Sequence, residues 1–67
     1  MVMELRSLDF TGERVKRIRV MLGETQKQFA VRLGVHPNMV GLWEAGRSKP
    51  TSAPALKALL EAEEVPA

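Results

Sequence analysis

The sequence contains no cysteine and no tyrosine, and its aromatic residues are one tryptophan and two phenylalanines. Without cysteine the chain can form neither a disulfide nor a thiolate metal site, and with so few rings its core must be mainly aliphatic. No apolar run approaches the roughly 20 residues that a membrane span needs, and the N-terminus lacks the pattern of a secretory signal. We therefore expect a cytoplasmic protein that makes no membrane contact.

The length of 67 residues allows one domain at most. A domain this small buries only about 60% of the surface of its unfolded chain, so it depends on well-packed helices or on self-association. An apolar fraction of 45% and many strong helix formers favour the helical solution. The sequence has no paired carboxylates, no nucleophile with an adjacent base and no phosphate-binding loop. We expect no enzymatic activity and no cofactor or metal.

The net charge of +2 is distributed unevenly along the chain. Residues 11–50 hold eight basic and three acidic residues, whereas residues 1–10 and 51–67 each carry a small negative charge. A basic middle segment suits a polyanionic partner. Charge segregation is also typical of an ordinary solvated face, so the charge pattern alone does not identify the partner.

Residues 1–10 are the least regular part of the sequence, and we interpret them as an N-terminal arm before a domain at 11–67. Thr11 is a plausible N-cap for a helix from about residue 12 to residue 22. Val15, Ile18 and Leu22 repeat at the helical period and predict its buried stripe. Gly23 follows at the position where glycine commonly ends a helix.

Two short helices are predicted next. Thr25 and Gln28 form the pattern of a capping box at the start of one helix, which ends at Gly34. Pro37 begins the following helix at a position where its missing N–H costs nothing, and this helix runs to about Ala45. A link of only three or four residues forces a sharp turn between them, which is typical of a helix-turn-helix.

A fourth helix is predicted after the basic loop at residues 47–50. Thr51 is its expected N-cap, and Leu56, Leu59 and Leu60 form its apolar face. The pattern is lost over residues 61–67, where Pro66 forbids continuation. The sequence therefore predicts an all-α, compact bundle of four to five helices that contains a helix-turn-helix.

Residues 15–60 carry several short blocks in a fixed register, among them Thr25-Gln26, Leu33-Gly34-Val35 and Trp43-Glu44-x-Gly46. The full set is Val15, Ile18, Arg19, Gly23, Thr25, Gln26, Phe29, Ala30, Leu33, Gly34, Val35, Val40, Trp43, Glu44, Gly46, Arg47, Lys49, Pro50, Leu56, Leu59 and Leu60. In this arrangement the chain resembles the phage-repressor/Cro-type (xenobiotic-response-element-like) helix-turn-helix family. The resemblance implies a lambda-repressor-like DNA-binding fold whose partner is double-stranded DNA.

The resemblance also implies that the helix from Pro37 is a recognition helix, which lies in the major groove. If Val40 and Trp43 face inward, the candidate base-reading residues are His36, Pro37, Asn38, Gly41 and Leu42. Asn38 is the first choice, because a carboxamide can pair with N6 and N7 of adenine together. Leu42 suits either a thymine methyl group or a neighbouring helix, and Gly41 suits close approach to either DNA or a helix.

Further roles follow from the resemblance. The candidate contacts to the DNA backbone are Thr25, Gln26, Arg47, Ser48 and Lys49. The first two begin a helix whose N–H groups can hold a phosphate, and the other three lie in a loop that relatives place along the sugar-phosphate backbone. Arg19 and Glu44 are expected to form a partly buried ion pair that orients the recognition helix.

Three interpretations of the whole chain remain. The first is a transcriptional regulator of the repressor type that binds DNA as a homodimer. The second is an antitoxin-type module that binds a toxin protein and autoregulates its own operator; an adjacent toxin reading frame would favour it. The third is one domain of a longer protein.

Overall fold

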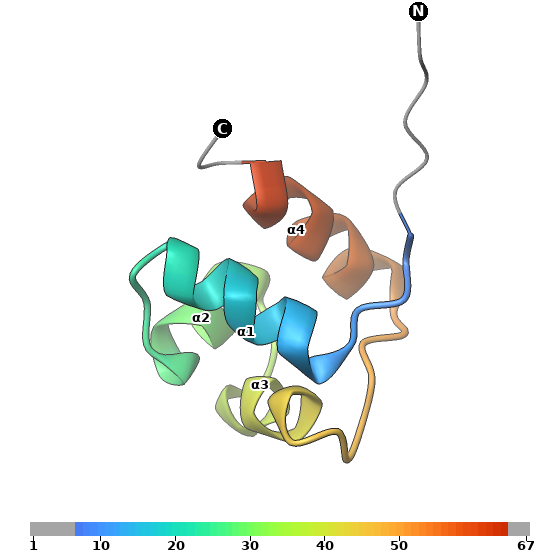
Figure 1. The fold of residues 1–67 in the computed structure, drawn as a ribbon, viewed down its shortest axis with the longest axis horizontal. Helices are drawn as coiled ribbons and strands as arrows, with labels where there is room; N and C mark the ends of the chain where they lie inside the picture. The colour runs from blue at the N-terminus through green and yellow to red at the C-terminus, as the bar shows by residue number, and fades with distance from the viewer. Residues whose placement is uncertain (1–6, 65–67) are drawn as a thin grey trace, which may run out of the picture.

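The computed structural model describes residues 7–64. Four helices occupy this range, namely α1 (Gly12–Met21), α2 (Gln26–Leu33), α3 (Pro37–Glu44) and α4 (Ala53–Glu64). Figure 1 shows α1 and α2 in the middle of the molecule, with α3 on one side of them and α4 on the other. The all-α fold predicted from the sequence is confirmed, with four helices in the described part of the chain. Over residues 7–64, no helix is both long and apolar enough to cross a membrane.

The first two helices begin where their capping residues predicted. Thr11 Oγ1 accepts a hydrogen bond from the Arg14 N–H at 3.2 Å. Thr25 forms the full capping box, because its Oγ1 accepts from the Gln28 N–H at 3.1 Å while Gln28 Oε1 accepts from the Thr25 N–H at 2.9 Å. Each cap satisfies amide groups that have no partner inside the helix. Both predicted N-termini are therefore confirmed.

The turn between α2 and α3 depends on Gly34, whose φ of +72° lies in the left-handed region. Glycine adopts this conformation without the steric cost that other residues meet. The chain can therefore reverse directly after α2 and place Pro37 at the start of α3. Val35 follows the turn and packs against the core.

The prediction for the ends of α4 was wrong in two respects. Ser52, not Thr51, caps the helix, since its Oγ accepts from the Ala55 N–H at 3.3 Å and its carbonyl accepts from the Leu56 N–H at 3.0 Å. The helix also continues to Glu64, well into the stretch expected to lose the pattern. Its fully buried face consists of Ala55, Leu59 and Ala62, and Leu56 and Leu60 are only partly buried. Small alanines let α4 lie close to the other helices.

One hydrophobic core joins all four helices. Its buried members are Phe10, Val15, Ile18, Phe29, Ala30, Leu33, Val40, Trp43, Ala55, Leu59 and Ala62. As expected, most are aliphatic, and three aromatic rings supply the largest volumes.

Phe10 precedes the first helix but is only 1% exposed. The guanidinium of Arg14 lies 3.9 Å from the centroid of its ring. Arg14 also donates to the carbonyl of Ser7 at 2.6 Å and to both carboxylate oxygens of Glu63 at 2.8 Å. Residues 7–10 are thus tied to α1 and α4. The rest of the predicted arm lies outside the described residues, and the division at residue 10 stays a prediction.

Candidate nucleic-acid interface

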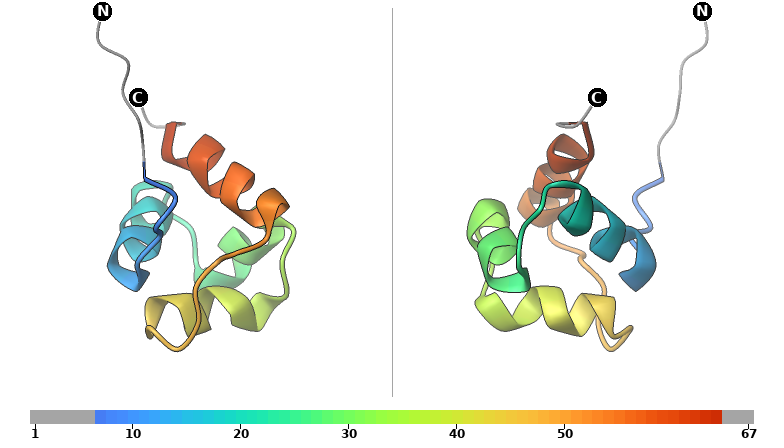
Figure 2. Two further views of the ribbon diagram at one scale, coloured as in Figure 1. Left: turned by 90° about the vertical axis from the view of Figure 1, so that its right-hand side faces the viewer. Right: turned by 60° about the vertical axis from the view of Figure 1, so that its left-hand side comes forward.

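Helix α3 forms one end of the molecule. Its inner face is sealed, because Val40 is 0% and Trp43 is 2% exposed. The helix packs on α1 and α2, and Figures 1 and 2 show its outer side uncovered by the other helices. A helix held in this way can enter the major groove of B-DNA, which is about 12 Å wide.

The predicted base-reading residues divide into exposed and partly covered ones. Pro37 and Asn38 are exposed on the first turn of α3, and Leu42 is 38% exposed one turn later. His36 is exposed as well, but it is also the N-cap, since its Nδ1 accepts from the Asn38 N–H at 3.1 Å. That bond fixes the tautomer that carries its proton on Nε2. Nε2 is therefore left as a donor that can point away from α3.

Gly41 is half-buried because the side chain of Gln26 lies against it. A Cβ atom at this position would be 3.3 Å from Gln26 Oε1. Of the two roles left open for Gly41, the structure therefore shows close approach to the neighbouring helix. The first turn of α2 rests on the middle of α3 through this contact.

Gln26 has a second partner that the sequence did not reveal. Its Nε2 donates to Glu44 Oε1 at 3.2 Å, so the predicted phosphate-binding amide bridges α2 to the end of α3. An amide nitrogen carries two hydrogens, and only one of them is used in this bond. Thr25 is exposed beside Gln26, with its hydroxyl oxygen engaged in the capping box.

The expected ion pair between Arg19 and Glu44 is present. Nε of Arg19 lies 2.7 Å from Oε2 of Glu44, and its Nη2 lies 3.1 Å from Oε1, which is the bidentate geometry. The side chains are 15% and 8% exposed. Arg19 also donates to the carbonyl of Glu24 at 2.9 Å, and the carboxylate of Glu24 pairs with Arg32 at 2.6 Å. Together these bonds link α1, the α1–α2 loop and α2 to the end of α3.

Burial raises the pKa of the Glu44 carboxyl, but the hydrogen bonds from Arg19 and Gln26 and the nearby positive charges outweigh it and lower the pKa below its ordinary value. A carboxyl whose pKa is lowered by folding stabilises the protein above the unfolded pKa of about 4.3 and loses that contribution as the pH falls through the folded value. The Arg19–Glu44 pair is therefore an acid-sensitive support of α3.

We predict that Glu44→Gln costs about 1–2 kcal/mol of unfolding free energy near pH 6, because a charged hydrogen-bond partner is lost. The Tm of the wild type should fall between about pH 6 and pH 3 more steeply than that of the variant. Circular dichroism melts at several pH values measure both slopes. Glu13→Gln is the matched control, since Glu13 forms an exposed pair with Arg17. Parallel slopes for wild type and Glu44→Gln would show that this pair does not carry the pH dependence.

The three candidate backbone contacts in the loop after α3 differ in exposure and in their partners. Arg47 is exposed, and its N–H donates to the Leu42 carbonyl at 3.0 Å to close the helix. This N–H is consequently not free for a phosphate. Ser48 is half-buried. Lys49 Nζ lies 2.6 Å from Asp9 Oδ1, with both side chains 60% exposed. Exposed pairs of this kind are weak.

Ion pairs reduce the free positive charge of the basic middle segment. Arg14, Arg17, Arg19, Arg32 and Lys49 each face an acidic partner. Within the part of the chain that the structure describes, three members of the segment have no ion pair, namely Lys16, Lys27 and Arg47. The count of basic residues in the sequence therefore overstates the free charge, because pairs such as Arg14–Glu63 join residues far apart in the chain.

A comparison with protein-family models gives a match to a helix-turn-helix family over residues 15–62. Neither a curated protein nor a solved structure gives a significant match. The matched segment runs from the first buried residue of α1 to the last buried residue of α4, and it includes the complete α2–turn–α3 unit. On this evidence the chain belongs to the Cro/C1-type helix-turn-helix family, whose members are DNA-binding regulators.

Proposed function

We propose that this protein is a sequence-specific, non-enzymatic transcriptional repressor that reads the major groove with α3. The observation that carries the proposal is the two-sided character of this helix: Val40 and Trp43 are sealed in the core, whereas Pro37 and Asn38 stand exposed on its first turn. A bound protein of this kind represses by occupying DNA that the transcription machinery needs.

Direct reading is assigned to the exposed turn of α3. The carboxamide nitrogen of Asn38 donates to N7 of adenine, and its oxygen accepts from the N6 amino group of the same base. Leu42, which is 38% exposed, packs against a thymine methyl group one helical turn later. His36 Nε2 contributes a donor at the entry of the helix, because its other ring nitrogen is held by the cap.

Contacts to the DNA backbone are assigned to two segments beside α3. The N-terminus of α2 directs N–H groups and the positive end of its dipole outward, and the second amide hydrogen of Gln26 extends this donor set. On the other side, Arg47, Ser48 and Lys49 supply charge and a hydroxyl group. To bind a phosphate, Lys49 must give up its ion pair with Asp9. The free-energy cost is small because the pair is exposed to solvent.

Binding as a homodimer would place two α3 helices on half-sites about one helical turn, or about 10 base pairs, apart.

The second candidate function is an antitoxin-type module with a protein partner. The exposed apolar side chains of Val20, Met21 and Val31, which are 57%, 60% and 73% exposed, favour some protein contact. A toxin reading frame beside this gene would support the antitoxin, and its absence would support the homodimeric repressor.

The experiment that tests the proposal begins by selecting bound sites from a random DNA pool. Asn38→Ala should then lose preference at one base position, which corresponds to about 1–3 kcal/mol of discrimination. Lys49→Ala should weaken binding to all sequences alike and lower the salt dependence by about 0.9 log unit per tenfold change in salt. Fluorescence anisotropy titrations at several salt concentrations measure both effects.

Lys57→Ala is the matched control for loss of one positive charge. Lys57 is exposed on α4, and Figure 2 shows α4 on the side of the molecule away from α3. This variant should bind DNA as the wild type does. Equal losses for Asn38→Ala on every DNA tested would refute the assignment of base reading to α3.

A further inference from the structure

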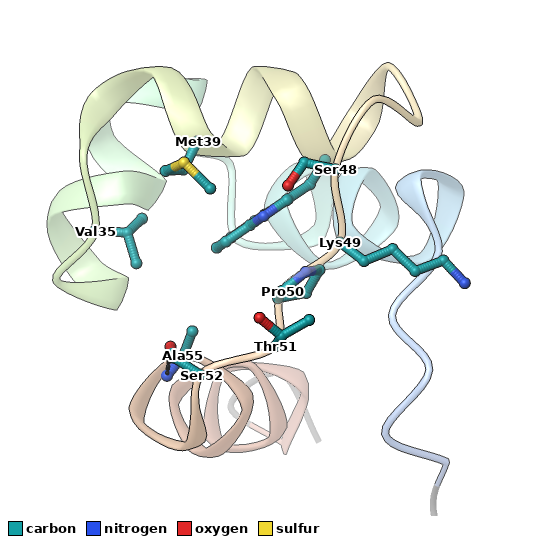
Figure 3. Close-up of a pocket in the computed structure, with 9 residues that line it drawn as sticks. Val35, Met39, Ser48, Lys49, Pro50, Thr51, Ser52 and Ala55 are labelled. Atoms are coloured by element: carbon teal, nitrogen blue, oxygen red, sulfur yellow. Dashed lines mark hydrogen bonds between the residues drawn. The ribbon is translucent and has the colours of Figure 1, made fainter.

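Lys16 is an exposed basic residue of α1 and has no ion pair within residues 7–64. The carboxylate of Glu13, three residues earlier on the same helix, pairs with Arg17 at 3.5 Å. Lys49 differs, because its ammonium group lies 2.6 Å from Asp9, and Figure 3 shows its side chain directed toward the N-terminal segment. The charge of Lys16 is therefore available to an external anion, whereas that of Lys49 is already balanced.

The helical register of α1 places Lys16 beside the end of α3. Gly12, Lys16 and Arg19 are spaced by four and then three residues, so they lie on one face of α1. A Cβ atom on Gly12 would collide with the carbonyl oxygens of Trp43 and Glu44, the last residues of α3. Arg19 binds the carboxylate of Glu44. Lys16 lies between these two contacts, and Figure 1 shows the start of α1 next to the end of α3.

The carboxylate of Glu44 is already shared by two other donors. Arg19 binds both of its oxygens, at 2.7 and 3.1 Å, and Gln26 Nε2 donates to Oε1 at 3.2 Å. Burial raises the pKa of Glu44, but the hydrogen bonds from Arg19 and Gln26 and the charges of Arg19 and Lys16 lower it below its ordinary value. This effect agrees with a position of Lys16 near the carboxylate.

Lys16, Arg19, Gln26 and Glu44 together form what we call the Glu44 cluster. It contains two positive side chains and one negative side chain, so it carries one surplus positive charge. Gln26 is exposed and has a second amide hydrogen that is not used in the bond to Glu44. A free ammonium group and a free amide donor therefore flank the same carboxylate.

We propose that Lys16 and Gln26 jointly bind one phosphate of the DNA backbone, which makes α1 a third segment of the interface beside α2 and the loop after α3. The phosphate accepts from Lys16 Nζ and from Gln26 Nε2, and its charge balances the surplus of the Glu44 cluster. Hydrogen bonds between charged groups of this kind are about twice as strong as neutral ones. The assignment rests on the proposed binding of DNA by α3.

The test uses the full chain and duplexes of its selected site in which one phosphate at a time is replaced by an uncharged methylphosphonate. At the phosphate in question the wild type should lose about tenfold in affinity, as expected for one charged hydrogen bond. Lys16→Met and Gln26→Ala should each bind unmodified DNA more weakly. Both should also be insensitive to neutralisation of one and the same phosphate while they keep their response at the others. Fluorescence anisotropy measures every combination.

Two variants serve as controls. Lys16→Arg keeps the charge and should retain the wild-type response, and Lys57→Ala removes a charge from α4, on the side away from α3. Thermal melts show that each variant is folded. If Lys16→Met kept the full wild-type response, or if it and Gln26→Ala became insensitive at different phosphates, the joint site would be excluded. Base reading by α3 would survive that result, since it is measured by the base preference of Asn38→Ala. Absence of binding by the wild type to any duplex would overturn both proposals.

Discussion

Replacing Gly12 with alanine is expected to lower the free energy of unfolding by about 3 kcal/mol, the upper range for an overpacked site. A Cβ atom at residue 12 would lie 2.5 Å from the Trp43 carbonyl oxygen and 2.6 Å from that of Glu44. These are backbone atoms at the end of α3, so no side chain can rotate to make room. Gly12 therefore sets how closely α1 approaches α3. In a domain of this size the Tm should fall by roughly 12–24 °C.

Gly41→Ala is the matched control, because the same change should have the opposite sign. A Cβ atom at residue 41 would lie 3.3 Å from Gln26 Oε1, the end of a flexible side chain that can shift. Alanine is favoured over glycine inside a helix by about 1 kcal/mol, so this variant should melt at or above the wild-type temperature. Thermal melts of both proteins give the comparison. An unchanged Tm for Gly12→Ala would refute the close packing of α1 on α3.

Local signals predicted much of this fold because they act over three or four residues. Thr11, Thr25 and Pro37 mark the starts of three helices, and Gly34 marks the end of one. Each does so through its own backbone geometry or hydrogen bonds. The same reasoning chose Thr51 over Ser52 for α4, since two adjacent hydroxyl residues are equivalent in sequence and differ only in the turn they occupy. The continuation of α4 was missed because Ala62 is small, and only packing shows that it is buried.

The candidate site also combines features that local sequence signals predicted with contacts that only the folded structure shows. Asn38 and Leu42 are exposed on α3 as the helical period predicted. The resemblance predicted one contact between distant residues, Arg19–Glu44. Two others, Gln26–Glu44 and Lys49–Asp9, had no signal in the sequence. The last two contacts bear on the proposed function, because Gln26 and Lys49 are two of the five residues expected to contact the DNA backbone, and both already hold a partner in the free protein. Under the proposed assignment DNA would add to the first contact and displace the second, which would couple recognition to the support of α3.

Phe10→Ala is expected to have the largest effect on stability, a loss of about 3–5 kcal/mol, which is typical for a buried phenylalanine. The ring is 1% exposed and also stacks against the Arg14 guanidinium. Arg14 in turn holds Ser7 and Glu63, so removal of the ring loosens the contact between α1 and α4. Domains of this size have only about 3–5 kcal/mol of stability. The variant should therefore be largely unfolded at 25 °C, with a loss of helical circular dichroism.

Leu8→Ala is the control for this change, since it truncates a large apolar side chain two residues away that is 54% exposed. It should leave the melting curve nearly unchanged, because little apolar surface is buried there. The pair of variants asks whether the segment before α1 belongs to the folded body. If Phe10→Ala melted like Leu8→Ala, Phe10 would be dispensable and the core would consist of the four helices alone. If only Phe10→Ala unfolded, the DNA-binding body would begin before its first helix, at the residue that lies beneath Arg14.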